Sequence, residues 1–170
     1  MATRAKSRAN QAGPAATHDP AKASAPIDVL ERTTEIMGGA AAIGRAIDNE
    51  VELLEAVRRG LPAVVLGALE RAGMAREEVE RLVVRSSPDG QEGHDRRRDL
   101  TPLESDRVVR CARVLASAED VFGSTERAQG WLRRPKPVLD GRTPMEVLDS
   151  EVGARVVEDL LQGVAHGIAA

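Results

Sequence analysis

The chain has 170 residues, of which 42% are hydrophobic, so it can bury the core of one medium domain or two small ones. It contains one Trp, one Phe and no Tyr, so its core must consist of Leu, Val, Ile and Ala, which favours packed helices over a sheet. With 24 basic and 27 acidic residues the net charge is −3, which excludes a global attraction to nucleic acid or to an anionic membrane.

Redox and targeting signals are sparse. The single cysteine, Cys111, excludes an intrachain disulfide framework, and no apolar run is long enough to span a bilayer. The basic N-terminus lacks the continuous apolar region of a secretory signal. We therefore expect a soluble, cytoplasmic protein.

Residues 1–26 are rich in Ala, Ser and Pro and show no apolar period, which predicts a disordered tail. Its basic side chains either assist a partner or only solubilise the chain. Residues 28–37 then predict a short helix ended by Gly38 and Gly39, and the Ala-rich segment up to Ile47 fits either a helix or an extended lead-in.

Three short helices are expected between residues 48 and 84. The first covers 51–59, with Asp48 or Asn49 as its N-cap and Gly60 as its C-cap; the second begins at Pro62, and the third covers 75–84. Their apolar faces comprise Leu53, Leu54, Val57, Val65, Leu66, Leu69, Val79, Leu82 and Val83. Such helices, joined by Gly-containing turns, fit a helix-turn-helix domain.

A recognition helix should then follow at about residues 86–98, but this segment contains Pro88, Gly90 and Gly93, and each Gly costs roughly 1 kcal/mol inside a helix. The segment is either a degenerate recognition element or a basic loop. Four arginines are the candidate phosphate-binding residues of a DNA surface: Arg85, Arg96, Arg97 and Arg98.

The longest helix is expected to start at a capping box, Thr101 to Glu104, and to end at Gly123. Val108, Ala112, Leu115 and Phe122 keep helical period along it, with Cys111 at the edge of that apolar face. Three arginines lie on one polar face, Arg107, Arg110 and Arg113, and Arg110 is spaced for an ion pair with Asp106. Solvated surface salt bridges are favoured over a phosphate site.

Ser124 is the expected N-cap of a short helix that carries Trp131 and that Pro135 and Pro137 stop. Asp140 and Gly141 form a predicted turn, and residues 143–146 form a second capping box that predicts a new helix. Asp149 or Ser150 caps a last helix, whose apolar face would comprise Val152, Val156, Val157, Leu160, Leu161, Val164 and Ile168.

The run WLRRPKPVLDGRTPMEVL, followed by VGARVVEDLL and a terminal HG, resembles the C-terminal toxin-binding domain of the Xre/MbcA/ParS antitoxins. The resemblance covers residues 100–168 well and 51–84 more loosely. It implies a degenerate Xre-like helix-turn-helix domain over 27–99 and a toxin-binding domain over 100–170, both all-α. It also implies a non-enzymatic antitoxin that covers the active site of a RES-domain, NAD-degrading toxin, forms a homodimer within a toxin–antitoxin complex, and represses its own operon by binding operator DNA.

The positions that match the family motif are, by number in this sequence, Trp131, Leu132, Pro137, Leu139, Gly141, Arg142, Thr143, Pro144, Gly153, Leu160, Leu161 and Gly167. Most of these also have a packing or turn role. The predicted toxin-binding residues are Trp131, Leu132, Arg142, Thr143, Pro144, Gly163, His166, Gly167, Ile168 and Ala170.

Catalytic and metal-binding patterns are missing from the sequence. The three histidines are widely separated, and neither a Cys/His cluster nor a phosphate-binding Gly-rich loop is present. We therefore expect no cofactor, no metal and no enzymatic activity. The alternative function is a helix-turn-helix repressor without a toxin partner.

Overall fold

The computed structural model describes residues 28–84 and 99–167. Within these ranges it contains helices and one isolated β-bridge, between Pro62 and Asp99, so the predicted all-α fold is confirmed. The predicted tail over 1–26 lies outside the described residues. So do six predicted site residues: Arg85, Arg96, Arg97, Arg98, Ile168 and Ala170.

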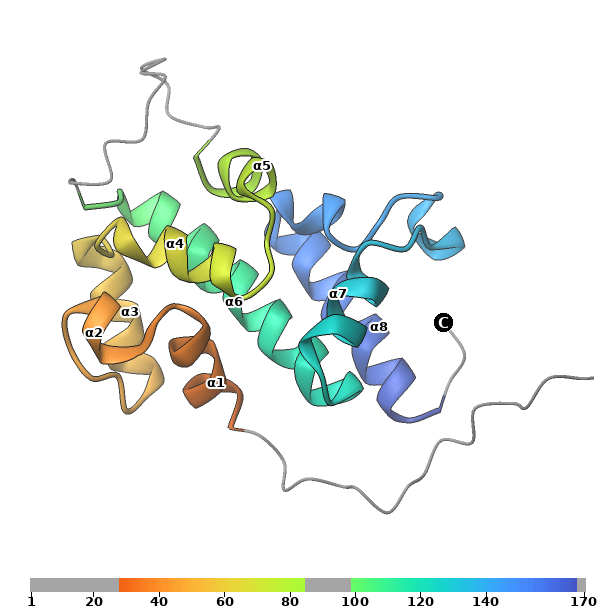
Figure 1. Ribbon diagram of the computed structural model, residues 1–170, viewed down its shortest axis with the longest axis horizontal. Helices are drawn as coiled ribbons and strands as arrows, with labels where there is room; N and C mark the ends of the chain where they lie inside the picture. The colour runs from red at the N-terminus through yellow and green to blue at the C-terminus, as the bar shows by residue number, and fades with distance from the viewer. Residues whose placement is uncertain (1–27, 85–98, 168–170) are drawn as a thin grey trace, which may run out of the picture.

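The chain forms its elements in two runs (Figure 1). The first run contains α1 (Val29–Ile36), α2 (Gly39–Ile43), α3 (Glu50–Arg59), α4 (Val64–Arg71), α5 (Arg76–Val79) and a π-helical segment, η1 (Glu80–Val84). The second run contains α6 (Pro102–Phe122), α7 (Thr125–Leu132), the 3-10 turns η2 (Pro137–Leu139) and η3 (Glu146–Asp149), and α8 (Glu151–Ala165).

The longest described helix, α6, is the axis of the molecule. It begins at the predicted capping box: the Glu104 amide donates to Thr101 Oγ1 at 3.2 Å, and the Thr101 amide donates to Glu104 Oε2 at 2.8 Å. It ends at Gly123, whose φ of 66° is left-handed. Both predicted ends of this helix are confirmed.

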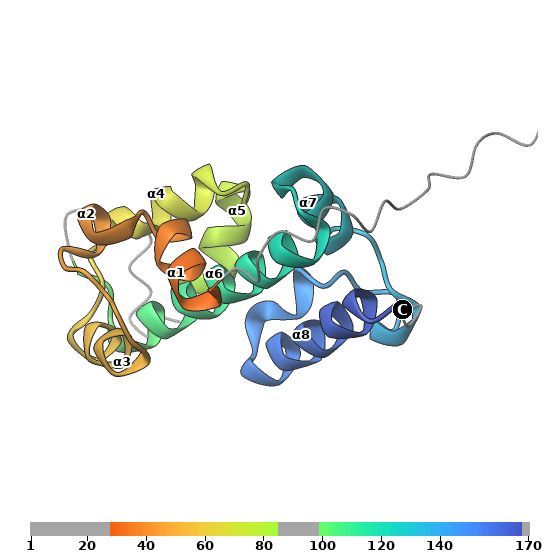
Figure 2. The ribbon, with the colours of Figure 1, turned by 90° about the horizontal axis from the view of Figure 1, so that it is seen from below.

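Helices pack on opposite sides of α6. Figure 2 shows α8 on one side and α1, α4, α5 and α7 on the other, and α3 packs near the start of α6. Several of the buried positions of α6 are small, which lets neighbouring helices approach closely: Ser105, Cys111, Ala112, Ala116 and Ala118. One continuous hydrophobic cluster therefore joins the helices of the first run to those of the second.

The first run agrees with most of the local predictions. Asn49 caps α3 by accepting from the Glu52 amide at 3.0 Å, and the ambiguous Ala-rich segment is the short helix α2. Leu54, however, is 47% exposed, so its predicted place on the buried face is wrong; Ala56 is buried instead. The predicted helix over 75–84 is α-helical only up to Val79 and then widens into η1.

A backbone joint fixes the start of α6 to the α3–α4 connection. The Leu100 amide donates to the Leu61 carbonyl at 2.7 Å, and the Leu61 amide donates to the buried Ser105 hydroxyl at 2.8 Å. The approach is so close that a Cβ at Gly60 would lie 2.2 Å from the Leu100 carbonyl oxygen. The start of the second run is thus held against the α3–α4 connection of the first run by contacts with its main chain.

The second run ends in two helical pieces of different kinds. The capping box at Thr143 is present, but the residues after it form the 3-10 turn η3, so the predicted regular helix there is wrong. Ser150 caps α8 by accepting from the Gly153 amide at 3.1 Å. Helix α8 ends at Ala165, and Gly167 just beyond it adopts a left-handed φ of 72°; Ile168, predicted on the same apolar face, lies outside the described residues.

Candidate functional site

The segment after α7, residues 133–142, which we call the tip loop, closes on itself between residues 136 and 142. The Lys136 amide donates to the Arg142 carbonyl at 2.9 Å, and the Gly141 amide donates to the Lys136 carbonyl at 3.0 Å. Asp140 and Gly141 adopt positive φ values of 54° and 78°, which confirms the predicted turn. Because its main chain is paired within itself, the loop keeps one shape.

Trp131 anchors the tip loop to the core. The ammonium nitrogen of Lys136 lies 4.3 Å from the centroid of the Trp131 ring, and the ring centroid of Phe122, the last residue of α6, is 5.6 Å from that of Trp131. Burial, together with the positive charge of Arg134, lowers the pKa of Lys136 below its ordinary value. The tip loop is therefore held by a desolvated cation on an aromatic face.

Two predicted toxin-binding residues lie inside the molecule. Leu132 is 0% exposed, and Trp131 is 9% exposed, so both side chains belong to the core. In this structure Trp131 positions the tip loop and Leu132 fills the interior, and their contact with a toxin stays a prediction. Pro144 is likewise buried, which leaves Arg142 as the exposed residue of the predicted set in this segment.

Thr143 has a structural role in the capping box. Its amide donates to Glu146 Oε2 at 2.7 Å, and its hydroxyl accepts from the Glu146 amide at 3.2 Å. Hydrogen bonds from the Thr143 amide and hydroxyl, with weaker help from Arg81 and Arg142, lower the pKa of the Glu146 carboxyl. The cap fixes the direction in which the chain leaves the tip loop.

Helix α8 has one buried and one exposed apolar side. Ala154, Val157 and Leu161 are at most 1% exposed and face α6. Val152 and Val156, which the sequence places on the same apolar face, are instead 73% and 36% exposed. These two residues, one helical turn apart, form an exposed apolar strip on α8, which we call the outer strip.

The remaining predicted residues lie at the end of α8. Gly163 is half-buried within the helix, and a Cβ there would meet nothing within 4 Å. His166 and Gly167 are exposed; Nδ1 of His166 lies 2.7 Å from the Gln162 carbonyl oxygen. Gly167 follows the end of α8 with a left-handed φ of 72°.

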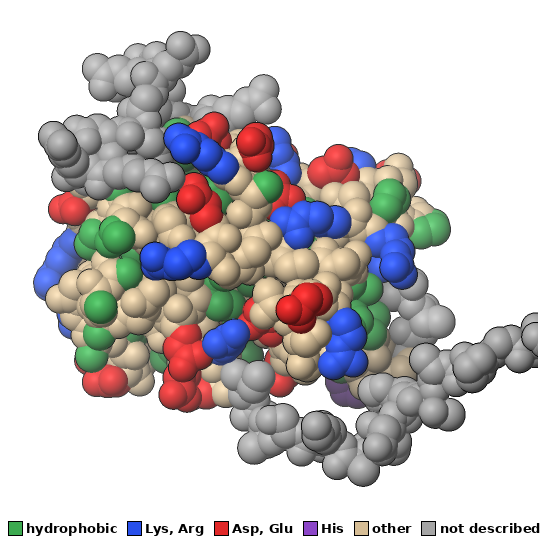
Figure 3. Space-filling view, in the orientation of Figure 1, with side chains coloured by type: hydrophobic (Ala, Val, Ile, Leu, Met, Phe, Trp, Pro, Cys, Tyr) green, Lys and Arg blue, Asp and Glu red, His purple; other side chains and the backbone are tan. Residues whose placement is uncertain are grey.

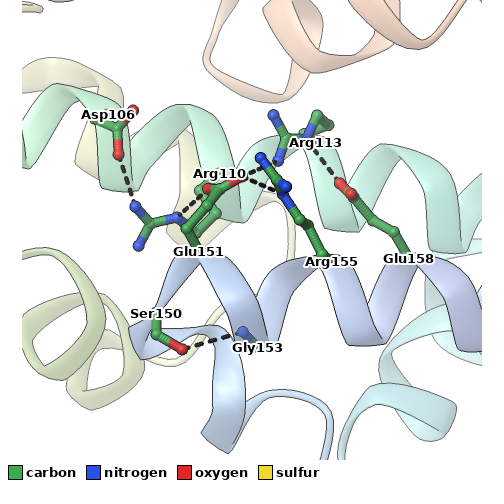
Figure 4. Close-up of polar contacts among 8 residues, drawn as sticks. All are labelled: Asp106, Arg110, Arg113, Ser150, Glu151, Gly153, Arg155 and Glu158. Carbon is green, nitrogen blue, oxygen red and sulfur yellow. Dashed lines mark hydrogen bonds and ion pairs between the residues drawn. The ribbon is translucent and has the colours of Figure 1, made fainter.

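An ion-pair cluster joins α6 to α8, which the spacing of residues along α6 alone does not predict (Figure 4). Arg110 is 8% exposed and binds Asp106 at 2.7 Å and Glu151 at 3.1 Å. Arg113 binds Glu158 at 2.7 Å and Glu151 at 3.6 Å. The predicted pair of Asp106 and Arg110 is confirmed, but these arginines do not form a solvated face, because they reach across to the neighbouring helix.

The third arginine of that predicted face has another role. Arg107 donates to the Val83 carbonyl at 3.2 Å, so it satisfies the end of η1. A polar depression of about 340 Å³ lies near this segment, between Glu78, Arg81, Arg133, Thr143, Met145 and Glu146. Within this depression Arg133 binds Glu78 at 2.6 Å. This ion pair ties α5 to the C-terminal end of α7.

Nucleophilic and metal-binding chemistry finds no support in the described ranges. Burial raises the pKa of the Cys111 thiol to about 12, so the thiol stays protonated at neutral pH. Across residues 28–84 and 99–167 no group of three or more His, Cys, Asp or Glu side chains is placed to hold a metal ion. In the same ranges none of the helices has the length and apolar character to cross a membrane.

Comparisons with known proteins point to one family. Residues 117–167 match the family described as "Antitoxin Xre/MbcA/ParS C-terminal toxin-binding domain", a segment that contains the tip loop, the outer strip and the α8 side of the ion-pair cluster. Over 130 residues the chain is 30% identical to "Antitoxin Xre" of Yersinia enterocolitica, which covers 74% of this chain and 86% of that protein.

Other relatives match a shorter part. "Antitoxin Xre" of Pseudomonas putida is 42% identical over 73 residues, which is 43% of this chain and 46% of that protein. A "Prs ADP-ribosylating antitoxin" of a Sphingobium species is 31% identical over 77 residues, 40% of this chain and 48% of that protein. The chain thus spans about half the length of these two relatives and most of the Yersinia protein.

Proposed function

The chain belongs to the Xre/MbcA/ParS antitoxin family, and on that premise we propose that it neutralises a RES-domain toxin that degrades NAD, by covering the toxin's active site. It acts as a binding protein and not as an enzyme. The kind of toxin follows from the family resemblance of the motif around Trp131, and the following paragraphs give what supports the proposal in this chain.

The observation that carries the proposal is the outer strip of α8. Val152 is 73% exposed in the segment that matches the toxin-binding domain, on a helix whose other side is completely buried against α6. A single exposed valine is ordinary, but two on adjacent turns of one helix form a surface that a partner can cover. A helix that is apolar on two opposite sides normally packs against a neighbour on each of them.

The ion-pair cluster supports the same role. Glu151, the first residue of α8, binds Arg110, Arg113 and Arg155 at 3.1, 3.6 and 3.4 Å. Together with the buried inner side of α8, these contacts fix the rotation of the helix about its axis. The outer strip is consequently presented in one orientation before a partner arrives, which reduces the entropy lost on binding.

The end of α8 supplies the blocking element in this proposal. Gly163, His166 and Gly167 are not needed for the core, since Leu161 is the last completely buried residue of the described chain. Ile168 and Ala170, which lie outside the described residues, complete the predicted element. Truncation after Gln162 should leave the fold intact and relieve inhibition of NAD consumption by the toxin.

The proposed assembly also contains a homodimer and operator DNA. Exposed apolar side chains on α3, Val51 at 65% and Leu54 at 47%, support a second copy of the chain against that helix. Replacing both by Asp should convert a dimer into a monomer in sedimentation analysis. For DNA, exchange of Arg96, Arg97 and Arg98 for Ala should flatten the salt dependence of binding to the upstream promoter fragment.

The function is tested with a purified RES-domain toxin as the candidate partner. Wild-type protein should bind it and stop its consumption of NAD at equimolar concentration. Val152→Asp combined with Val156→Asp should weaken inhibition at least tenfold, because two charges replace the apolar strip. Leu103→Asp is the matched control, since Leu103 is 54% exposed on α6 outside the matched segment. Full NAD consumption in the presence of excess wild-type protein contradicts the proposal.

A further inference from the structure

The tip loop carries exposed arginines that form no ion pair with a described carboxylate. Residues 133–142, RRPKPVLDGR, contain four basic residues and one acidic residue, in a chain whose net charge is −3. Arg133 is paired with Glu78, and Lys136 is buried on Trp131. Arg134 and Arg142 are exposed, and neither forms an ion pair with a described carboxylate; Arg142 only donates to the Leu139 carbonyl at 3.4 Å.

An apolar point accompanies these two cations. Val138 is 61% exposed at the turn of η2, and Pro135 and Pro137 beside it are exposed as well. At the right-hand edge of Figure 3, where Figure 1 draws the light-blue loop after α7, Lys or Arg side chains adjoin hydrophobic ones. The surface thus combines a small apolar projection with positive charge.

The loop is also rigid enough to act as a recognition element. Hydrogen bonds between residues 136 and 142 close its backbone. The Leu139 side chain, which is 7% exposed, packs into the hydrophobic core and holds the loop against it. Its two prolines limit the conformations of the free chain. An exposed loop held in this way loses little conformational freedom when a partner binds it, which is a property of preorganised binding surfaces.

We propose that the tip loop docks into an acidic recess on the partner toxin, with Val138 in a small apolar pocket and Arg134 and Arg142 against carboxylates at its rim. This inference rests on the proposed function and names the chemistry of the toxin surface. A protein partner is favoured over nucleic acid because the loop lies within the toxin-binding segment at 117–167 and because its exposed Val138 side chain is apolar, which a phosphate backbone does not recognise.

The test compares affinities of full-length variants for the purified toxin at low and high salt. Arg134→Glu with Arg142→Glu should weaken binding at least tenfold and flatten its salt dependence, because both variants remove favourable charge pairs. Val138→Ser, which leaves the charge unchanged, should weaken binding several-fold at both salt concentrations. Arg71→Glu, at an exposed position of α4 outside the matched segment, is the matched control and should bind like the wild type. Circular dichroism should show the same melting temperature for all variants.

Milder variants keep the result interpretable, since Arg134→Gln with Arg142→Gln should give a smaller loss in the same direction. Unchanged affinity in the Glu and Gln variants, with wild-type protein binding normally, overturns this inference and leaves the proposed function standing. No binding by wild-type protein overturns both. A duplex DNA probe that binds wild-type protein and is released by Arg134→Glu with Arg142→Glu also overturns the inference, because the loop would then serve nucleic acid.

Discussion

At the scale of single residues, Gly153 carries a packing constraint that its place on α8 does not reveal. A Cβ at this position would lie 1.8 Å from the Val147 carbonyl oxygen, so η3 lies directly against the first turn of α8. The contact is with backbone, which cannot rotate away as a side chain can. Gly153 therefore sets the distance between the two segments.

Gly153→Ala should destabilise the protein by about 1–3 kcal/mol, because the methyl group forces η3 and α8 apart. Gly163→Ala in the same helix meets nothing within 4 Å and should stabilise it by roughly 0.5–1 kcal/mol through helix propensity. Urea unfolding of both variants measures the difference. Equal stabilities would show that η3 yields to the added methyl group.

Thr143 is the second residue whose effect can be isolated. Thr143→Val keeps the shape of the side chain and removes the acceptor of the Glu146 amide, so it should cost on the order of 1 kcal/mol. Equilibrium unfolding in urea checks this value. A variant as stable as the parent would mean that water replaces the hydroxyl without loss.

At the scale of elements, α6 and α8 are joined by charge as well as by apolar contact. Arg110→Met keeps the length of the side chain and leaves Asp106 and Glu151 without their shared cation. Both carboxylates are about half exposed, at 54% and 45%, so the cost should be about 1–2 kcal/mol and not the 3–5 kcal/mol of a fully buried pair. Arg155→Met is the control, since Arg155 is 72% exposed and its pair should be worth little.

The same cluster predicts a dependence on pH. Burial acts to raise the pKa of Glu151, but the Arg110 hydrogen bond and the charges of Arg113 and Arg155 outweigh it, so the pKa is lowered from 4.5. A lowered folded-state pKa adds stability above the unfolded-state value, and this stability is lost as pH falls through the folded-state pKa. Glu151→Gln should therefore be less stable than wild type at pH 7, with the gap closing below about pH 4. Thermal melts across this range measure it; a constant gap would contradict the assignment.

Element boundaries follow from the sequence wherever local chemistry decides them. Caps at Asn49, Thr101, Ser124 and Ser150 and the stop at Gly123 are visible because each depends on residues within one turn. The exposed strip on α8 is not visible, because apolar spacing identifies a face without saying whether another helix covers it. The partners of Arg110 are equally hidden, since Glu151 is 41 residues away in the chain.

At the scale of the whole molecule, α6 packs against helices of both halves of the chain, and a single cluster of buried residues includes them all. Trp131, the only Trp in the sequence, reports on the second half, whereas far-ultraviolet circular dichroism reports on every helix. The two signals should therefore lose native character at the same urea concentration. Separate midpoints would support two independent domains with a boundary near residue 99.

The residues of the candidate site fall into those that the motif identifies and those that only the folded structure identifies. Arg142 and the exposed end of α8 were accessible to motif reading, whereas Val138 and Arg134 gain their importance from the closed shape of the tip loop, which brings them together only after folding. Trp131 and Leu132 are buried, which shows that a family motif marks residues that hold a surface in place as readily as residues that form it.

The joint between Leu61 and Leu100 bears on how this chain can change over evolution. The segment between Val84 and Asp99 leaves the core just after Val83, which is 0% exposed, and returns just before Leu100, which is 3% exposed and bonded to Leu61. Because the core holds the chain at both ends of this connection, doubling the length of the connection costs only about 0.6 kcal/mol in closure entropy. We therefore expect changes in length and sequence there to cost little folding free energy, so this connection can differ between relatives while the packing of α6 is kept.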